Sequence, residues 1–352
     1  MIKLGLDQFK NIYGKIALVT NATGVDSNLI YNFDKLENVS LIFTPEQGLY
    51  GTMLDGESIG DSYIKGIKVS SLYGSIKSPR DEDLDGIDAI VYDIEDAGVR
   101  YFTYISTMKL VMESAKKNGI RMIVLDRPNP IRADEIYGPI LPESNLSFVG
   151  IESIPIKYGM TPGELALFFN RKINAEIEIK SMEGYSRSMW HEDALNYYVP
   201  LSLHLPTMES VVNYQAFCLL EATNISVGRG TPSPFMQFGA PGLEKVETDV
   251  EGIKLRHVKF RPMYSLYWGE LIDGYYVHIL DRSKYDPFKL VFDIMKSYNK
   301  LEINKKKMNL LLGDDSIYNY ISGSVTYEEI LEKWNSQLEK FNEIRKKFLI
   351  YS

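Results

Sequence analysis

The sequence predicts an α/β protein with a Rossmann-like, doubly wound and mostly parallel sheet, together with a second, smaller α/β domain. In the first half, short apolar runs rich in β-branched residues alternate with segments of helical potential. A loop rich in glycine, aspartate or proline follows each run. Continuous apolar runs of this kind are typical of parallel strands that helices cover on both faces, and the alternation favours a doubly wound sheet.

The strands of the first half are predicted from short, continuous apolar runs. A helix is predicted before the last of them, over residues 104–118, because two lysines lie in its last turn and Gly119 follows as a stop signal. The predicted strands are residues 15–20, 39–43, 67–72, 89–93 and 121–126.

Beyond residue 150 the alternation is less regular. A helix is predicted to begin at Pro162, with Thr161 as its N-cap and Glu164 completing a capping box. Residues 226–242 are rich in glycine and proline, and we interpret them as the joint between two domains. The predicted domains are a Rossmann-like catalytic domain, residues 1–235, and a smaller α/β domain that completes the cleft, residues 236–352. The smaller domain is predicted to contain strands at 258–263 and 275–280 and helices at 287–301 and 327–349.

The composition is that of an ordinary folded protein. Of the 352 residues, 45% are hydrophobic and 24% are charged, and the formal net charge is −8. An acidic balance argues against nucleic acid or anionic membranes as partners. We therefore expect a neutral or weakly charged small-molecule ligand, and the oligomeric state is left open.

The N-terminal segment, the hydrophobic runs and the single cysteine indicate where the protein is located. The N-terminus has no apolar segment followed by small cleavage-site residues, and no stretch reaches the roughly 18 apolar residues of a membrane span. We therefore expect a cytoplasmic protein with no membrane partner. The single cysteine, Cys218, lies in an apolar run and is expected to be a buried packing residue.

Several motifs that hold cofactors or nucleophiles are missing. No G-x-G-x-x-G follows the first strand and no Walker A pattern occurs, so no nucleotide cofactor is expected. The histidines lack the spacing of a zinc site, and no metal ligands are assigned. The G-x-S-x-G elbow of α/β-hydrolase esterases is also missing.

Polar residues follow the predicted strands, at the edge where parallel sheets bind ligands. Asn21 follows the first strand, and Glu46 follows the second. Glu46 lies between Pro45 and Gly48, which restrict the backbone to a tight turn, and a carboxylate on such a mount suits a general acid. The alternative is a glutamate that caps a helix or braces the loop.

Three carboxylates, Asp93, Glu95 and Asp96, lie close together at the end of the fourth predicted strand. Their mutual repulsion is costly unless a cation, a metal ion or protonation offsets it. Arg100 lies four residues after Asp96, so an internal salt bridge is one explanation. A magnesium site is another, because hard cations prefer oxygen ligands.

Two further segments are candidates for ligand binding. Asn129 lies between two prolines in the run 126–130, which suits either a preorganised hydrogen-bonding loop or a simple surface turn. Arg229 lies between two glycines, and its guanidinium matches a ligand carboxylate, although bracing the interdomain joint is an equally simple role.

Taken in order, these segments resemble a family, formerly of unknown function, that includes bacterial exo-β-N-acetylmuramidases, which are glycoside hydrolases with a Rossmann-like domain. The resemblance spans nearly the whole chain. The segments that carry it are residues 5–7, 18–26, 44–51, 92–104, 125–130, 158–164, 221–234 and 235–241.

The resemblance implies exo-cleavage of a terminal N-acetylated amino sugar similar to N-acetylmuramic acid, as in peptidoglycan recycling. It implies that Glu46 is the catalytic acid. Because glycosidases usually use paired carboxylates, we expect Asp93 or Glu95 to steer water or the oxocarbenium-like charge. The predicted substrate-binding residues are Asn21, Gln47, Asp96, Arg100, Tyr104, Asp126, Arg127, Asn129, His204, Asn224, Arg229 and Thr231.

The sequence departs from the family pattern in three places. Gln47 stands where histidine is usual, Glu95 where glutamine is usual, and residues 201–204 where Pro-Ser-Pro-Asn is expected. A hydrolase of a different glycoside is therefore an alternative. A non-catalytic sugar-binding protein is the alternative from another class, and the missing glycine pattern disfavours a nucleotide-dependent enzyme.

Overall fold

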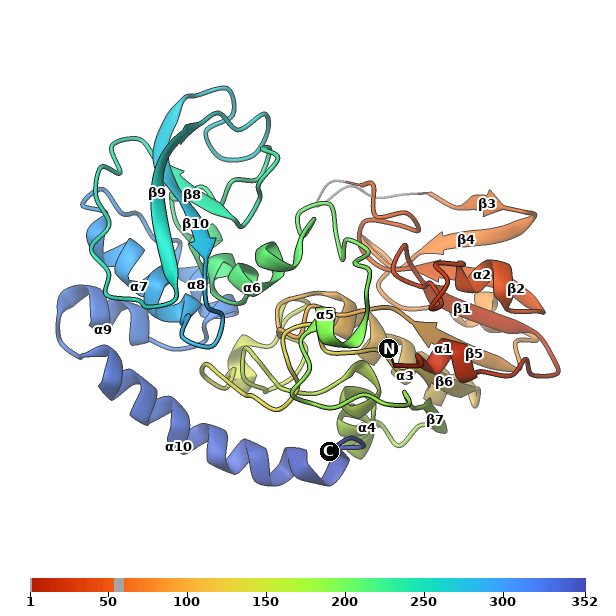
Figure 1. Ribbon diagram of the computed structural model, residues 1–352. Coiled ribbons are helices and arrows are strands. Elements are labelled where there is room, and N and C mark those ends of the chain that lie inside the picture. Colours follow the sequence, from red (N-terminus) through yellow and green to blue (C-terminus); the bar gives the residue numbers. More distant parts are fainter. Residues whose placement is uncertain (1, 54–59) are drawn as a thin grey trace. The chain divides into compact units, whose positions relative to one another are not determined.

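The computed structural model describes residues 2–53 and 60–352, which form two compact units (Figure 1). The first unit comprises residues 1–136, 158–203 and 341–352, and the second comprises residues 137–157 and 204–340. Both units are therefore discontinuous in sequence. By contacts, residues 204–235 group with the second unit, and the division into domains at residue 235 stays a prediction.

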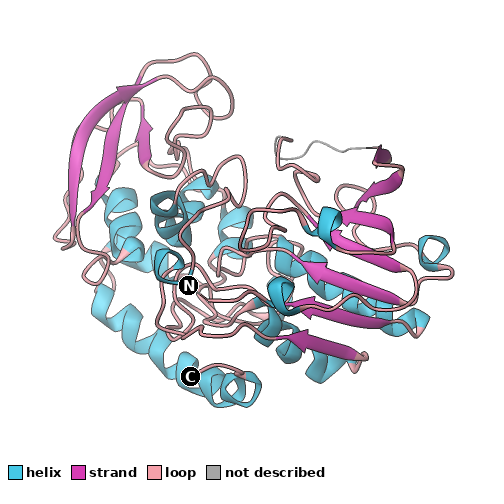
Figure 2. Ribbon diagram, turned by 45° about the vertical axis from the view of Figure 1, so that its right-hand side comes forward, coloured by secondary structure: helices cyan, strands magenta, loops and turns pink. Residues whose placement is uncertain are grey.

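The first unit is built on a seven-stranded sheet with the order β3-β4-β2-β1-β5-β6-β7. All neighbouring strands pair in parallel except β3, which is antiparallel to β4. Figure 2 shows these strands side by side, with helices on both sides of the sheet. The Rossmann-like, mostly parallel sheet is thus confirmed. Its strands are β1 (Ile16–Thr20), β2 (Val39–Thr44), β3 (Ser62–Ile64), β4 (Ile67–Ser71), β5 (Ala89–Asp93), β6 (Arg121–Leu125) and β7 (Ile177–Lys180).

The topological switch point of this sheet lies between β1 and β5. The chain runs from β1 outward through β2 to β4, and then returns to place β5 on the other side of β1. The parallel register aligns Thr20 of β1 with Asp93 of β5, so both strands end at the same level. Ligands of doubly wound sheets bind outside the carboxyl ends of the strands at such a point.

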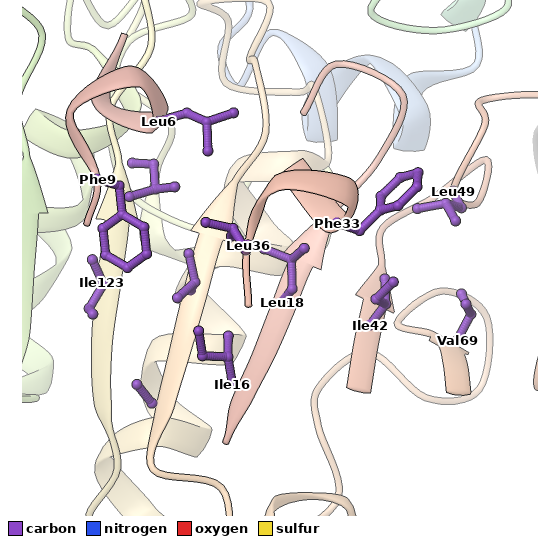
Figure 3. Packing of buried hydrophobic residues seen from close by; sticks show 13 residues of the cluster. Leu6, Phe9, Ile16, Leu18, Phe33, Leu36, Ile42, Leu49, Val69 and Ile123 are labelled. Atoms are coloured by element: carbon purple, nitrogen blue, oxygen red, sulfur yellow. The ribbon is translucent and has the colours of Figure 1, made fainter. Parts of the chain in front are cut away.

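One face of this sheet packs against the short helices α1 (Gly5–Gln8) and α2 (Asn32–Lys35). Figure 3 shows Leu18 and Ile42 of the strands beside Phe33 and Leu36 of the α2 region. The longer helices α3 (Tyr104–Asn118) and α4 (Pro162–Ile173) contact each other and β6. All residues of β1 and β5 are buried, which explains why their sequences are continuously apolar.

The predicted helices of the first unit are confirmed. Helix α3 has the predicted bounds and ends at Gly119 in the left-handed conformation. Helix α4 begins at Pro162, and Thr161 and Glu164 form the predicted capping box. The described part of this unit also contains a short helix, α5 (His191–Ala194), and a 3₁₀ turn, η1 (Asp81–Leu84).

The second unit combines helices with a three-stranded antiparallel sheet of order β8-β10-β9. It is smaller and α/β in class, as predicted, and the free thiol of Cys218 is buried. Among the described residues, no helix has the length and apolar character needed to span a membrane. The elements of this unit are η2 (Glu143–Asn145), α6 (Met208–Phe217), η3 (Cys218–Ala222), β8 (Gln237–Ala240), β9 (Ile253–Phe260), β10 (Ile272–Ile279), α7 (Pro287–Ser297), α8 (Lys305–Leu311) and α9 (Ser316–Ser322).

Several predicted limits in the second half were wrong. Strand β9 begins at Ile253 rather than at residue 258, because its exposed face carries charged residues that hide the strand pattern. Helix α7 ends at Ser297 rather than at residue 301, where Tyr298 takes an extended conformation. Helix α10 (Tyr327–Arg345) continues only as the 3₁₀ turn η4 (Lys346–Phe348), and it leads from the second unit into the first.

The Thr161 hydroxyl generates a stability prediction. It accepts the Glu164 amide at 3.2 Å and donates to Asp126 Oδ2 at 2.8 Å. Thr161→Val should lower the free energy of unfolding by about 1–2 kcal/mol, because both hydrogen bonds are lost while the side-chain volume is kept. Urea unfolding would measure this change. The matched variant Thr161→Ser retains the hydroxyl and should lose much less, and equal losses in the two variants would contradict the capping role.

Candidate active site

Glu46 lies on a tight turn that directly follows β2. The Gly48 amide donates to the Pro45 carbonyl at 3.2 Å, which closes the turn around Glu46 and Gln47. Glu46 is half-buried, and its Oε2 accepts the Thr103 hydroxyl at 2.7 Å. Thr103 comes from the loop between β5 and α3. The candidate acid is therefore oriented towards the β5 side of the sheet.

Gln47 makes this turn more rigid. Its φ of 71° lies in the left-handed region, which is unusual for a residue with a side chain and persists only where its surroundings hold it. The side chain is buried, and its Oε1 accepts the Leu203 amide at 3.2 Å. The contacts of Gln47 thus help to hold Glu46 on a single backbone conformation.

Gln47 also lines a surface depression of about 310 Å³. It extends over the carboxyl-terminal parts of β2 and β4 and over β3. The described residues that line it carry no charge, and most have a hydroxyl or amide group. They are Thr44, Gln47, Leu49, Tyr50, Thr52, Gly60, Ser62, Tyr63, Ile64, Val69 and Ser71.

At the switch point, Asp93 and Arg127 form a fully buried ion pair, with both side chains 0% exposed. Arg127 Nε donates to Asp93 Oδ1 at 2.6 Å, and Arg127 Nη2 donates to Asp93 Oδ2 at 3.0 Å. Asn32 Nδ2 adds a third hydrogen bond to Oδ2 at 2.7 Å. A bidentate fork of this kind fixes the guanidinium and the carboxylate in one plane. Both oxygens of Asp93 are therefore occupied by protein groups.

Glu95 shares the same arginine but is held less completely. Arg127 Nη1 donates to Glu95 Oε1 at 3.2 Å, while Glu95 Oε2 lies 3.7 Å from His191 Nε2. Burial favours the neutral form of Glu95. The nearby positive charges of His191 and Arg127, together with the Arg127 hydrogen bond, outweigh this effect and hold the pKa of Glu95 below its ordinary value. Glu95 is thus an ionised carboxylate at the switch point.

Asp96 is the third carboxylate of the cluster and lies in a different environment. Its Oδ2 accepts the Tyr158 hydroxyl and, at 2.7 Å, the Gly98 amide. Among the described residues, its buried Oδ1 has no hydrogen-bond partner. Burial raises the pKa of Asp96 to about 7, and the hydrogen bonds from Tyr158 and the backbone only partly oppose this effect. Below about pH 7 the protonated, uncharged form of Asp96 is therefore favoured, whereas Arg127 offsets the charges of its neighbours.

Three further predicted residues brace the loops around the switch point. Asp126 accepts hydrogen bonds from Gly163, Thr161 and Tyr351, and burial raises its pKa to about 6. Asn129 joins the Met160 carbonyl to the Ile131 amide. Asn21 Oδ1 accepts both the amide and the hydroxyl of Thr23. All three side chains are buried.

Arg100 and Tyr104 are also buried. The Tyr104 hydroxyl donates to the Leu201 carbonyl at 3.0 Å, in a segment that we call the strap and define as residues 190–203. The strap touches the loops that follow four parallel strands. After β1 and β2, the Tyr197 hydroxyl donates to the Asp26 carbonyl, and the Leu203 amide donates to the Gln47 side chain. After β5 and β6, the His191 ring faces Glu95, and the His191 amide donates to the Pro130 carbonyl.

The remaining predicted residues lie in the second unit. Arg229 Nε donates to Glu221, so its guanidinium already has a carboxylate partner within the protein. The ring of His204 hydrogen-bonds to the Tyr264 hydroxyl. Asn224 joins the Lys300 carbonyl to the Glu302 amide, and the Thr231 hydroxyl donates to the Gly228 carbonyl. No cluster of three or more metal-ligating side chains occurs in the described part of the chain.

Comparison with known proteins identifies the family. Residues 16–209 match the family model described as exo-beta-N-acetylmuramidase NamZ, N-terminal, and residues 212–351 match its C-terminal counterpart. The chain belongs to the NamZ family. It is similar to the peptidoglycan beta-N-acetylmuramidase NamZ of Bacillus subtilis (strain 168), with 38% identity over 369 residues, which cover 98% of this chain and 89% of that protein.

Solved structures agree with this placement in the NamZ family. Two crystal structures of DUF1343 family proteins from Bacteroides fragilis superpose with TM-scores of 0.86 and 0.81, at 31% and 26% sequence identity. Each comparison covers 100% of this chain and 99% of the other. As a member of the NamZ family, the chain is a glycosidase.

Sequence reasoning missed His191, which lies beside a carboxylate of the candidate site. It is 2% exposed and faces Glu95, yet it is separated from Glu95 by 96 positions, so no local spacing signals the contact. Arg127 offsets the charges of two residues of the acidic cluster, a pairing that the local spacing does not signal. Arg127 contacts Asp93 and Glu95, whereas the sequence had drawn attention to Arg100, four residues from Asp96.

The Arg127 ion pair generates a stability prediction. Arg127→Met should destabilise the protein by about 3–5 kcal/mol, because Asp93 and Glu95 would be left buried without their cation. Urea unfolding measures the effect. A matched control is Arg80→Met, which removes a similar fork on Asp83 at the surface and should have a much smaller effect. Similar losses in the two variants would contradict the importance of burial.

Asp96 should make stability depend on pH. Because its pKa is raised to about 7 in the folded state, the folded protein retains a proton that the unfolded chain releases near pH 4. Stability should therefore fall as pH rises from about 4 to about 7, and this decrease should be smaller in Asp96→Asn, which mimics the protonated carboxyl, with the remainder coming from Asp126 and its pKa of about 6. Melting temperatures across this range, compared between the two proteins, test the prediction. Parallel curves would contradict it.

Proposed function

We propose that the chain removes a terminal N-acetylated amino sugar, of the N-acetylmuramic acid type, from the end of a β-linked glycan. The family and the name of the Bacillus subtilis relative support this activity. The observation that carries the proposal is the position of Glu46. A half-buried carboxylate on a rigid turn at the carboxyl edge of the sheet is a suitable mount for a general acid.

In the proposed reaction, Glu46 donates a proton to the glycosidic oxygen while the bond from this oxygen to the anomeric carbon breaks. The Thr103 hydroxyl orients the carboxyl group through its 2.7 Å hydrogen bond to Oε2. The leaving group departs as an alcohol. The oxygen of a water molecule bonds to the anomeric carbon, and its proton passes to a carboxylate, which completes hydrolysis.

We assign the second carboxylate to Glu95 rather than to Asp93. Both oxygens of Asp93 are engaged by Arg127 and Asn32, and its side chain is completely buried. Glu95 uses one oxygen for Arg127 and turns the other towards His191. Its lowered pKa keeps it anionic, as is required of a group that stabilises the positive charge of the transition state or accepts a proton from water.

The depression beside Gln47 gives further support for a saccharide ligand. Hydroxyl and amide groups line it together with two exposed aromatic rings, Tyr50 and Tyr63. Sugars are bound by this combination of hydrogen-bonding groups and flat apolar surfaces.

The test is hydrolysis of a chromogenic β-N-acetylmuramide beside the matching β-N-acetylglucosaminide. The wild type should release chromophore from the muramide, and Glu46→Gln should reduce kcat by about 10²- to 10⁴-fold, because the acid is lost while the shape is kept. Glu113→Gln, an exposed substitution on α3, is the matched control and should retain full activity.

Other outcomes of this assay would redirect the proposal. Full activity in Glu46→Gln would show that another group is the acid. Turnover of the glucosaminide alone would indicate a different glycoside as substrate. Binding of the muramide without turnover, measured by calorimetry, would favour a sugar-binding protein.

A further inference from the structure

The buried charged side chains at the switch point have an unbalanced total charge unless a proton binds among them. Asp93, Glu95 and Arg127 are 0%, 3% and 0% exposed, respectively. They contribute two negative charges and one positive charge. A net charge that is removed from water is costly unless a nearby group neutralises it. A second positive charge or a bound proton is therefore needed beside these residues.

His191 is placed to carry this proton. It is 2% exposed, and its Nε2 lies 3.7 Å from Glu95 Oε2. Neither ring nitrogen has a hydrogen-bond partner among the described residues, so no neighbouring group fixes the ring in a neutral tautomer. The ring is held instead by packing, with its centroid 5.3 Å from that of Tyr198, and by the His191 amide, which donates to Pro130.

Arg127, Tyr197 and Tyr198, whose charges or titration are coupled to Glu95, do not supply the missing charge. Arg127 is shared with Asp93 through its bidentate fork. Burial, assisted by the charge of Glu95, raises the pKa of the strap residues Tyr197 and Tyr198 well above its ordinary value, so neither phenol changes this balance. The neighbouring side chain of Glu192 is exposed and acidic. Among these groups, only the imidazole of His191 can become a second cation.

We propose that His191 is a positioning residue, which carries one proton as an imidazolium and thereby holds Glu95 in its ionised form during catalysis. The inference rests on the proposed function, in which Glu95 acts on the substrate. With His191 protonated, two carboxylates and two cations balance. Without the imidazole, the buried group is neutral only when Glu95 itself takes the proton, and a protonated Glu95 can neither accept a proton from water nor stabilise an oxocarbenium-like charge.

The test compares pH profiles of kcat/KM for the wild type and His191→Gln, a neutral substitution of similar size. The loss of the imidazolium should raise the pKa of Glu95, so the acidic limb should move to higher pH. Activity near pH 5 should fall at least about tenfold more than activity near pH 8, since one pKa unit corresponds to a factor of ten. A purely structural role would lower activity by the same factor at both pH values.

The matched control is His257→Gln. His257 Nε2 also lies near a carboxylate, 3.6 Å from Asp273 Oδ1, but this pair is exposed on the small sheet. The profile of this variant should coincide with that of the wild type. If the acidic limb does not move in His191→Gln, the proposal is wrong.

A second measurement separates this proposal from the proposed function and does not need an active enzyme. The ¹⁵N chemical shifts of the ring distinguish imidazolium from neutral imidazole, and the chain has only four histidines to assign. His191 should be an imidazolium near pH 7 in the wild type and a neutral imidazole in Glu95→Gln. A neutral ring in the wild type would overturn the proposal even if the muramide is cleaved, whereas an imidazolium without muramide cleavage would leave the pair intact and refute only the assigned substrate.

Discussion

The fork of Arg127 on Asp93 joins the carboxyl ends of β5 and β6, and the polar groups of the switch point take their positions from it. The same guanidinium donates to Glu95 and to the Val25 carbonyl after β1. One side chain thus connects the ends of three neighbouring strands. Because the pair is completely buried, water does not compete for its hydrogen bonds, and its geometry is fixed. The residues that hydrogen-bond to it are therefore held in fixed positions.

The large sheet and α3 were predictable because their residues obey local rules. The inner strands are buried on both faces and are continuously apolar, and α3 ends with a glycine stop. Strands β7 and β9 were missed or misplaced because they are partly exposed and carry charged residues. Pro45 and Gly48 predicted the turn that carries Glu46. The left-handed conformation of Gln47 could not be predicted, because glutamine has no preference for that conformation.

The sequence identified most residues of the candidate site, but it did not predict which of them contact one another. The sequence brought attention to the carboxylates and to Arg127, yet the partners of each lie far away in the chain. Arg127 and Asp93 are separated by 34 positions, and His191 and Glu95 by 96. Parallel strand order brings the first pair together, and the strap brings the second. Neither arrangement leaves a local signal in composition or periodicity.

The discontinuity of the first unit affects the order in which it can form during synthesis. Residues 341–352 leave the ribosome after the whole second unit, yet they supply Phe341 and Phe348 to the packing of α4 and the Tyr351 hydroxyl to Asp126. A nascent chain that ends before this segment lacks part of the buried core of the first unit. The first unit therefore reaches its final packing only after this segment has been translated. Until then, part of the apolar surface of α4 is exposed and available for chaperone binding.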